Sequence, residues 1–195
     1  MLEILIWLES LDRAIFHFIN TTMASPMTDF IMVNVTLDLH LRIFYGVCVI
    51  LLLWKGDKRI RYAVLFSALA LAISDQLSSA VLKPLFERQR PCQFMEVHLL
   101  VKCGSGFSLP SSHAANLFAQ AYLFKGIAPK STKYLIPLAI IVALSRVFVG
   151  VHFPGDVLIG AALGTIIGVS MASLFKMIID KNIIKNKKEE KLFWR

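Results

Sequence analysis

The sequence is poor in charged residues, and this scarcity argues against an ordinary water-soluble protein. Charged residues make up 17% of the 195 positions, whereas hydrophobic residues make up 56%. A composition this apolar is typical of chains embedded in a lipid bilayer. The sequence also shows no internal repeat, and its only low-complexity stretch is a basic tail. We therefore expect a single domain over residues 1–195.

The sequence lacks a continuous basic stripe, although its net charge is +8. The positive residues instead gather between or after apolar runs, at residues 55–61, 125–133 and 176–195. This is the positive-inside pattern, so we expect these regions to face the cytoplasm and expect no nucleic-acid partner. A cleavable signal is not expected either, because Glu3 and Glu9 stand where a signal peptide has basic residues.

The apolar runs predict an all-α integral membrane helical bundle with about five transmembrane helices. We expect these at residues 41–54, 60–82, 111–124, 134–149 and 154–179. The first is short, because a straight span needs about 20 residues, so we expect it to begin slightly before residue 41 or to lie where the protein thins the bilayer. Within the last run, small residues at four-residue spacing indicate close helix packing. These are Gly160, Gly164 and Gly168.

The first 40 residues are too polar to cross a bilayer. Residues 2–20 carry apolar side chains at helical spacing among charged ones, and residues 27–37 form a second half-polar segment. Both patterns are typical of amphipathic helices at a membrane surface. The expected organisation is an interfacial region at 1–40, a transmembrane catalytic bundle at 41–180 and a basic cytoplasmic tail at 181–195.

The most informative polar stretch lies between the last two apolar runs, at residues 145–156. It carries Arg146, His152 and Asp156, and charged groups beside lipid usually mark function. The four-residue spacing lets the Asp156 carboxylate hold one nitrogen of His152 and leave the other free to react. The same two residues could instead only cap a helix. The planar guanidinium of Arg146 suits phosphate oxygens.

Two further motifs precede this stretch. Residues 83–91 read K-x6-RP, residues 110–113 read PSSH, and residues 145–156 read SR-x5-H-x3-D. In this order they resemble the motifs of the type 2 phosphatidic acid phosphatase family, over roughly residues 40 to 180. Ser112 departs from the glycine that is usual there, and a serine fits if its φ is negative. The resemblance implies a membrane phosphatase in which Lys83, Arg90 and Arg146 contact the phosphate.

Phosphoryl transfer suggests a role for each remaining residue. His152, oriented by Asp156, is the candidate nucleophile and would form a phosphohistidine, as the resemblance also implies. His113 is the candidate general acid for the leaving oxygen. The hydroxyl of Ser111 and the backbone N–H groups of Ser112 and His113 lie at a predicted helix N-terminus, which is a natural anion site.

The sequence predicts no metal and no cofactor. The acidic residues Asp75, Glu87, Glu96 and Asp156 do not form the dense oxygen cluster that Mg²⁺ takes. A zinc site would need a third ligand beside the two catalytic histidines, and none stands at a suitable spacing. We expect the partners to be a phosphorylated membrane lipid and the bilayer, and infer no obligatory protein partner. For Asp75 we favour a structural partner within the bundle.

Several functions remain open. Our leading hypothesis is a lipid A 1-phosphatase at the outer face of a bacterial inner membrane, with the active site facing the periplasm. Alternatives are an undecaprenyl pyrophosphate or phosphatidylglycerophosphate phosphatase, a lipid phosphotransferase sharing the covalent intermediate, and, from another class, a lipid-phosphate carrier. A carrier would need the anion-binding charges but not His152, His113 and Asp156 together.

The sequence has three cysteines, and two of them fall in the one long loop, residues 84–110, that we expect outside the cytoplasm. Disulfides persist in such compartments, so we predict a bridge between Cys92 and Cys103. It would help to hold Arg90 in place. Cys48 lies in an apolar run and reads as a small buried hydrophobic residue.

Overall fold

A computed structural model describes residues 2–181, so most of the predicted basic tail lies outside the described residues. The described part is helical throughout, apart from connecting loops, and contains no strand. In chain order the elements are α1 (Leu2–His17), η1 (Phe18–Thr22), α2 (Pro26–Thr36), α3 (Asp38–Lys55), α4 (Lys58–Gln76), η2 (Leu77–Leu82), α5 (Lys83–Phe86), α6 (Pro91–Phe94), α7 (Ser112–Ile127), η3 (Pro129–Ser131), α8 (Thr132–Phe148), α9 (Pro154–Phe175) and η4 (Lys176–Asp180). The predicted all-α class is confirmed.

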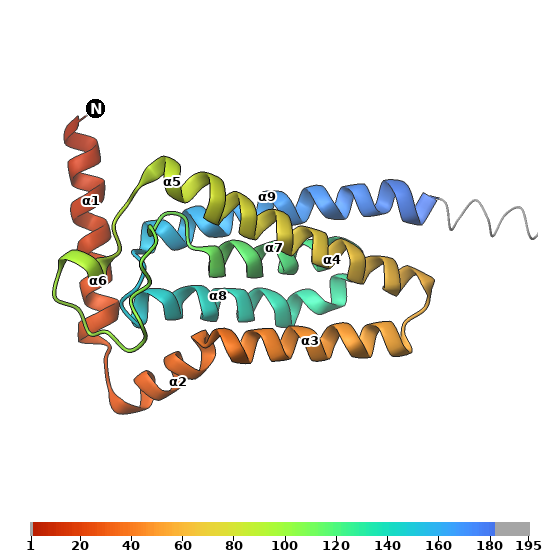
Figure 1. The fold of residues 1–195 in the computed structure, drawn as a ribbon, viewed down its shortest axis with the longest axis horizontal. Coiled ribbons are helices and arrows are strands. Elements are labelled where there is room, and N and C mark those ends of the chain that lie inside the picture. Colours follow the sequence, from red (N-terminus) through yellow and green to blue (C-terminus); the bar gives the residue numbers. More distant parts are fainter. Residues whose placement is uncertain (1, 182–195) are drawn as a thin grey trace, which may run out of the picture.

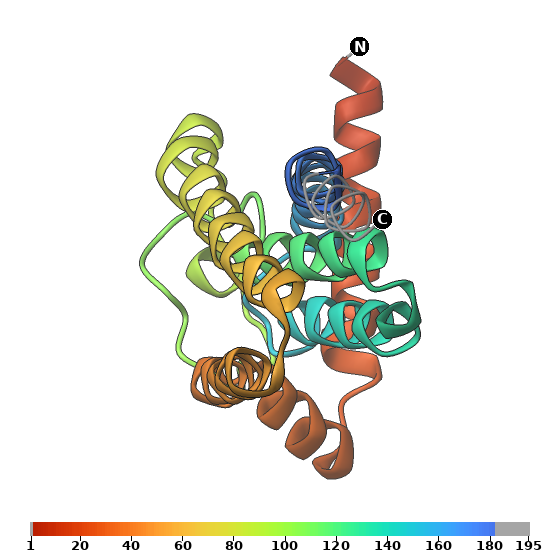
Figure 2. The same cartoon turned by 90° about the vertical axis from the view of Figure 1, so that its right-hand side faces the viewer.

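The long helices α3, α4, α7, α8 and α9 run side by side as a bundle, and α1 crosses one end of it at a steep angle (Figures 1 and 2). Three stretches are long and apolar enough to cross a membrane: Lys58–Phe94, Pro129–Phe148 and Pro154–Asp180. The pair α2 and α3, bent by 49°, passes the same test when taken together. The protein is therefore a multi-pass membrane protein, whereas the count of five spans stays a prediction because α7 has only 16 residues.

The helix ends differ from the predicted ones where polar residues continue a helix. The helix that starts at α4 does not stop near Lys83, because η2 and α5 carry it on to Phe86. The predicted loop at 84–110 is correspondingly shorter and holds the single turn α6. Helix α3 begins at Asp38, slightly before residue 41 as expected, with the charged side chain in its first turn. Acidic residues are favourable there, because the helix dipole is positive at that end.

Helices α7 and α9 form the centre of the bundle, and the three spaced glycines of α9 let them touch. A Cβ added at Gly160, Gly164 or Gly168 would fall within 2.5 Å of a backbone carbonyl oxygen of α7 or of Ser111, the residue directly before it. Only glycine permits backbones to approach this closely. The predicted packing role of these glycines is confirmed. The contact matters for function because it sets the N-terminus of α7 beside that of α9.

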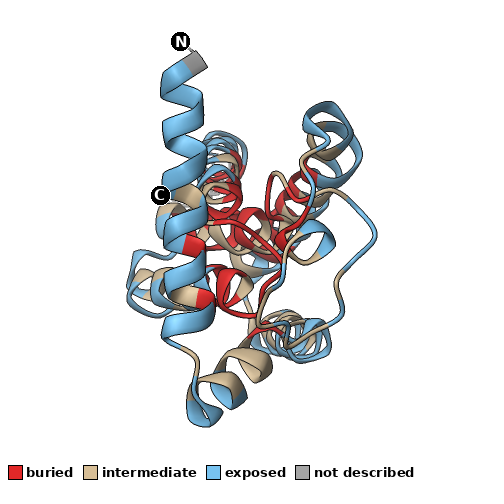
Figure 3. Cartoon of the chain, turned by 90° about the vertical axis from the view of Figure 1, so that its left-hand side faces the viewer, coloured by how far each residue is buried: buried red, intermediate tan, exposed pale blue. Residues whose placement is uncertain are grey.

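The first helix is exposed along most of its length, as the pale blue ribbon of Figure 3 shows. One of its contacts with the bundle is made by Phe16, whose ring centroid lies 5.3 Å from that of Phe153. Just beyond it, the buried amide of Asn20 bonds the carbonyl oxygens of His98 and Phe148 and the N–H of His98. This amide therefore ties the N-terminal segment, the long loop and the end of α8 together.

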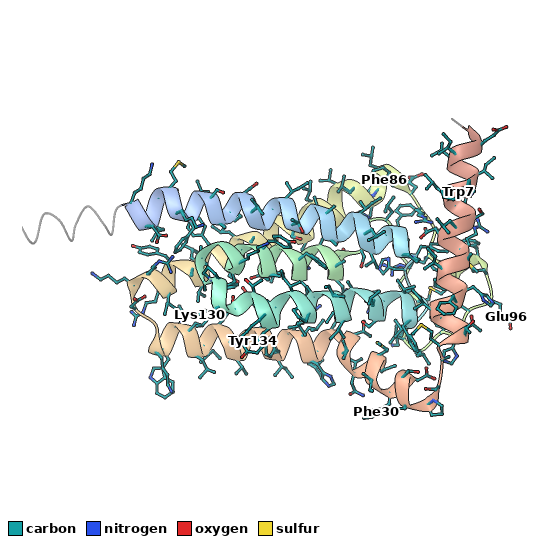
Figure 4. All side chains as sticks on the ribbon, turned by 180° about the vertical axis from the view of Figure 1, so that it is seen from behind. Trp7, Phe30, Phe86, Glu96, Lys130 and Tyr134 are labelled. Carbon is teal, nitrogen blue, oxygen red and sulfur yellow. A yellow bond between two sulfur atoms is a disulfide. The ribbon has the colours of Figure 1, made fainter. Side chains whose placement is uncertain are left out.

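The basic loops and the motif-bearing loops lie at opposite ends of the bundle. Figure 4 shows Lys130, between α7 and α8, toward one end, and Trp7 and Glu96 at the other. The α3–α4 connection shares the end of Lys130 (Figure 1). The predicted separation of positive loops from the catalytic motifs is therefore present in the fold.

Candidate active site

The predicted dyad of His152 and Asp156 is assembled at the start of α9. His152 is 2% exposed and Asp156 is fully buried, and His152 Nδ1 lies 3.5 Å from Asp156 Oδ2. The same carboxylate oxygen accepts the backbone N–H of Phe153 at 2.8 Å. Asp156 therefore caps α9 and also faces the imidazole, so the four-residue spacing serves both a helix cap and a histidine–aspartate pair.

Ser108 joins the dyad, and sequence reasoning did not find it. Its hydroxyl donates to Asp156 Oδ2 and lies 3.2 Å from His152 Nδ1. Two oxygens thus surround Nδ1, which favours the tautomer that carries its proton there. The lone pair is then on Nε2, which faces Arg90 Nη1 at 3.3 Å. Burial lowers the pKa of His152 to about 3, so the ring is neutral at physiological pH.

Arg90 lies beside Nε2 of His152, and two further cations lie near Arg90. Arg90 is 8% exposed and is held by the carbonyl oxygens of Gly106 and Val151. Lys83 and Arg146 lie close enough for their charges to act on Arg90 and on one another. The structure thus brings the three predicted phosphate contacts together, from α5, the long loop and α8. Such a cluster repels itself unless an anion lies between its members.

The N-terminus of α7 provides the other wall. Ser111 is the N-cap residue, and Ser112 and His113 open the helix with N–H groups that have no partner within it. Ser112 has a negative φ, since Glu87 is the one non-glycine residue with positive φ in the described part of the chain. The Oγ of Ser111 and the Nε of Arg146 are buried and have no partner among the described residues. Buried orphan donors fit an oxyanion between them.

His113 sits at the mouth of a cleft that opens between α3, α4 and α7. The cleft measures about 540 Å³, and His113, Asp38 and Asp75 line it together with Ser112. His113 Nε2 lies 2.8 Å from Asp38 Oδ1. Asp38 was not identified from the sequence, where it read as part of a surface helix. Asp75 accepts from Asn116 at 3.2 Å, so it has the structural partner that we favoured.

A second, more apolar cavity of about 370 Å³ continues from this cleft along α3. The two share Leu41, Tyr45, Leu117 and Gln120. Polar groups therefore gather at the end near His113, and side chains such as Leu52 and Leu138 line the other end. This gradient suits an amphiphile whose polar head lies beside His113.

For other residues of the site, the sequence contains no pattern that predicts their role. Arg88 lies inside the K-x6-RP motif at a position that the pattern leaves open, yet its Nη1 donates to Asp156 Oδ1 at 2.7 Å. Thr36 accepts from Arg146 Nη1 at 2.7 Å, and Ser78 donates to Ser112 Oγ at 3.0 Å. These contacts join segments that are distant in sequence, so no local pattern announces them.

The predicted loop cysteines are joined in the structure, where Cys92 and Cys103 form a disulfide with Cα atoms 6.0 Å apart. The bridged loop holds Arg90, because Gln93 accepts the Arg90 N–H and donates to the Gly104 carbonyl. Cys48 is a free, half-buried thiol. Within residues 2–181, no three His, Cys, Asp or Glu side chains gather as metal ligands.

Comparison with known proteins places this arrangement in a family. A sequence profile described as the PAP2 superfamily matches residues 61–180, more than half of the chain. The chain is 35% identical over 98 residues to decaprenylphosphoryl-5-phosphoribose phosphatase of Mycobacterium tuberculosis, covering 49% of this chain and 52% of that protein. It is 37% identical over 122 residues to lipid A 4'-phosphatase of Porphyromonas gingivalis, covering 58% and 51%. The alignments thus span about half the length of these relatives.

Two solved structures are similar in both fold and sequence. One is a transmembrane PAP2-type phosphatidylglycerolphosphate phosphatase from Bacillus subtilis, with a TM-score of 0.66 and 27% identity, covering 88% of this chain and 87% of that chain. The other is Aquifex aeolicus LpxE, with a TM-score of 0.67 and 26% identity, covering 84% and 95%. The described fold therefore resembles nearly the whole of two membrane proteins.

Proposed function

The chain belongs to the PAP2 superfamily, and from that membership we propose that it is a metal-independent lipid phosphatase acting through a phosphohistidine. The observation that carries the proposal is the juxtaposition of a buried, neutral His152 with a cluster of cations. Its Nε2 lies 3.3 Å from Arg90 Nη1, and the orphan donors of Ser111 and Arg146 are buried in the same site. A nucleophile beside a group of preorganised anion-binding donors is what phosphoryl transfer requires.

The reaction follows from the positions of the two histidines. His152 Nε2 attacks phosphorus, the bond from phosphorus to the lipid oxygen breaks, and His113 gives that oxygen its proton. Water then attacks the phosphohistidine, His113 takes a proton from it, and inorganic phosphate leaves as the P–N bond breaks. Lys83, Arg90 and Arg146 balance the phosphate charge throughout, and donors that are already in place supply a large share of the rate.

The cleft supports a lipid as the leaving group. Because His113 protonates the leaving oxygen, the rest of the substrate extends from the phosphate toward the cleft that His113 lines. The cleft continues into the apolar cavity beside α3, where a hydrocarbon chain avoids water. A carrier would use the same groove and cations, but it has no use for a paired acid and nucleophile.

We propose lipid A as the first candidate substrate, with the 1-phosphate as the leading position. Support comes from the similarity to a protein named lipid A 4'-phosphatase. Undecaprenyl pyrophosphate and phosphatidylglycerophosphate are the second candidates, the latter supported by the Bacillus subtilis structure. Phosphate release from a panel of these lipids, resolved by thin-layer chromatography, tests the proposal. The 1- and 4'-monophosphates of lipid A belong in that panel.

Three controls separate the alternatives. Phosphate release in a mixture without any acceptor lipid identifies a hydrolase rather than a phosphotransferase. Substrate binding without phosphate release by any lipid of the panel would leave the carrier hypothesis standing. Full activity in excess EDTA is expected because the proposed steps need no metal. Loss of activity with EDTA and its recovery with Mg²⁺ would refute the metal-free scheme.

We also propose that the site faces away from the cytoplasm, as the positive-inside pattern indicates. Glu96→Cys in a Cys48→Ser chain keeps the disulfide and adds a thiol at the site end, and Lys130→Cys adds one toward the opposite end (Figure 4). An impermeant thiol reagent should label the first variant in intact cells or spheroplasts, and the second only after lysis. The reverse pattern would invert the proposed topology.

A further inference from the structure

The surface helix α1 reaches the catalytic dyad through one side chain, Asp12. The two oxygens of Asp12 have different partners: Oδ1 accepts the N–H of Gly155 at 2.7 Å, and Oδ2 accepts from Arg88 Nη2 at 2.6 Å. Gly155 lies in the first turn of α9, directly before Asp156. Asp12 therefore contacts the catalytic helix and also the arginine that binds the catalytic carboxylate.

Arg88 is shared between two carboxylates. Its Nη1 donates to Asp156 Oδ1 at 2.7 Å while its Nη2 donates to Asp12. The guanidinium also lies over the Phe153 ring, 4.4 Å from its centroid. A planar group with one nitrogen on each acid and a ring against its face has little freedom to turn. A lysine, with a single ammonium, could not reproduce this arrangement.

We propose that Asp12 is a positioning residue for the dyad, acting through Arg88 on Asp156 and so on His152. Helix α1 then belongs to the catalytic unit and is more than a membrane anchor. The inference rests on the proposed function, because it takes His152 as the nucleophile. Asp12 lies outside the three motifs of the family resemblance, and Arg88 stands at a position that the first motif leaves open.

The charges explain why a second acid is needed. Asp156 is fully buried, and one arginine suffices to neutralise it. With Asp12 absent, the whole charge of Arg88 would act on Asp156 and weaken the pull of that carboxylate on the imidazole. Arg88 would also lose the bond that sets its orientation. Asp12 thus leaves Asp156 with enough negative charge to hold His152 in its reactive tautomer.

The close fit around Asp12 indicates a built contact. The carboxylate is 14% exposed, and a Cβ added at Gly155 would lie 3.0 Å from Asp12 Oδ2. A neighbouring pair on the same helix serves as a contrast. Glu9 and Arg13 form an i,i+4 ion pair at 2.6 Å, but their side chains are 56% and 47% exposed. Such exposed pairs contribute little.

The test compares Asp12→Asn with Glu9→Gln, because each removes one carboxylate charge from α1. The asparagine oxygen can still accept the Gly155 N–H, so the cap on α9 is kept. We expect Asp12→Asn to lower kcat about tenfold on both an aryl phosphate and a lipid phosphate, less than the hundredfold that a misplaced catalytic group can cost. KM should stay unchanged because Asp12 touches no substrate. Glu9→Gln should match the wild type.

A double-variant experiment identifies the route. Arg88→Gln should lower kcat at least as much as Asp12→Asn, and Asp12→Asn added to Arg88→Gln should cause no further loss. Rates are expressed per site that traps radiolabelled phosphohistidine, so a misfolded fraction does not enter them. A further loss in the double variant would show that Asp12 acts through α9 instead and would overturn the inference.

The outcome is distinguishable from failure of the proposed function. If no preparation traps phosphohistidine, the proposed chemistry fails and this inference fails with it. If the wild type traps phosphohistidine and turns over but Asp12→Asn equals Glu9→Gln, the positioning role alone is refuted. A rise in KM without a fall in kcat would also refute it, since that result would place Asp12 at the substrate.

Discussion

The protein contains two histidine–aspartate pairs, and they are built in opposite ways. His152 and Asp156 are 2% and 0% exposed, and they are surrounded by Ser108 and Arg88. In the other pair, the side chain of His113 is 20% exposed and that of Asp38 is 62% exposed, at the mouth of a cleft. The first pair is enclosed by protein, whereas the second lines a cleft and has an exposed carboxylate, although Nε2 of His113 is itself buried.

The difference matches the two proposed roles. A nucleophile must present one nitrogen in one direction, so it profits from several contacts that fix its ring. A group that first gives and then takes a proton must reach the leaving oxygen and later a water molecule, so it needs access. Burial keeps the nucleophile unprotonated by lowering the pKa of His152. Burial also lowers the pKa of His113, and there the hydrogen bond with Asp38 opposes the shift. The comparison predicts that substitutions in the two pairs lower activity by different amounts.

The largest effect is expected from the enclosed pair. His152→Ala should abolish phosphate release and phosphohistidine trapping, because no other described side chain occupies the place of its Nε2. Helical circular dichroism and detergent gel filtration check that the variant is folded. Turnover near the wild-type rate by a folded variant would contradict the role of His152 as nucleophile.

A substitution in the exposed pair should cause a loss of turnover whose size depends on the substrate. His113→Ala should reduce lipid phosphate turnover by about 10²- to 10⁴-fold, the usual contribution of a general acid. An aryl phosphate has a better leaving group and needs less protonation, so its turnover should fall less. Equal losses on both substrates would argue against His113 as the acid.

The enclosed pair was also the more predictable one. The spacing of His152 and Asp156 is local, and the four-residue separation suits one helical turn. The other pair joins the start of α3 to the start of α7, and no periodicity connects Asp38 with His113. Arg88 and Asp12 were missed for the same reason, since their contacts with the dyad depend on how α1 docks. Sequence patterns describe single elements, whereas packing decides which elements meet.

The fold shows the same division. The helical class followed from long apolar runs, and the packing of α7 on α9 followed from three glycines with regular spacing. Helix ends were less accurate, as with α5, because polar residues near Lys83 hid a helix that continues. The bent pair of α2 and α3 was also missed. Asp29, Asn34 and Asp38 gave that segment the composition of a surface element, although together with α3 it is long enough to cross a membrane.

A moderate effect is expected from the partner of the exposed histidine. Asp38→Asn removes a charge 2.8 Å from His113 Nε2, and an exposed pair of this kind contributes up to about 1 kcal/mol. We therefore expect kcat on lipid phosphate to fall about fivefold, with a smaller loss on aryl phosphate. A loss as large as that of His113→Ala would mean that the two pairs are less different than their exposure indicates.

The smallest effect concerns stability in acid and depends on the enclosed histidine. Burial lowers the pKa of His152 from 6.5 to about 3. Between these two pH values the histidine is protonated in the unfolded chain but neutral in the folded chain. The stability contributed by a neutral His152 is therefore present above pH 6.5 and is lost as the pH falls toward 3. His152→Gln removes this linkage. In detergent, the Tm of the wild type should decline more steeply between pH 6.5 and 4.5 than the Tm of His152→Gln, even if the variant has the lower Tm at pH 6.5.

His17→Gln is the matched control, because its side chain lies on exposed α1, and its Tm should fall with pH as steeply as that of the wild type. Parallel slopes for all three proteins would show that His152 is not held neutral by its surroundings, and the contrast between the enclosed and the exposed pair would lose its electrostatic basis.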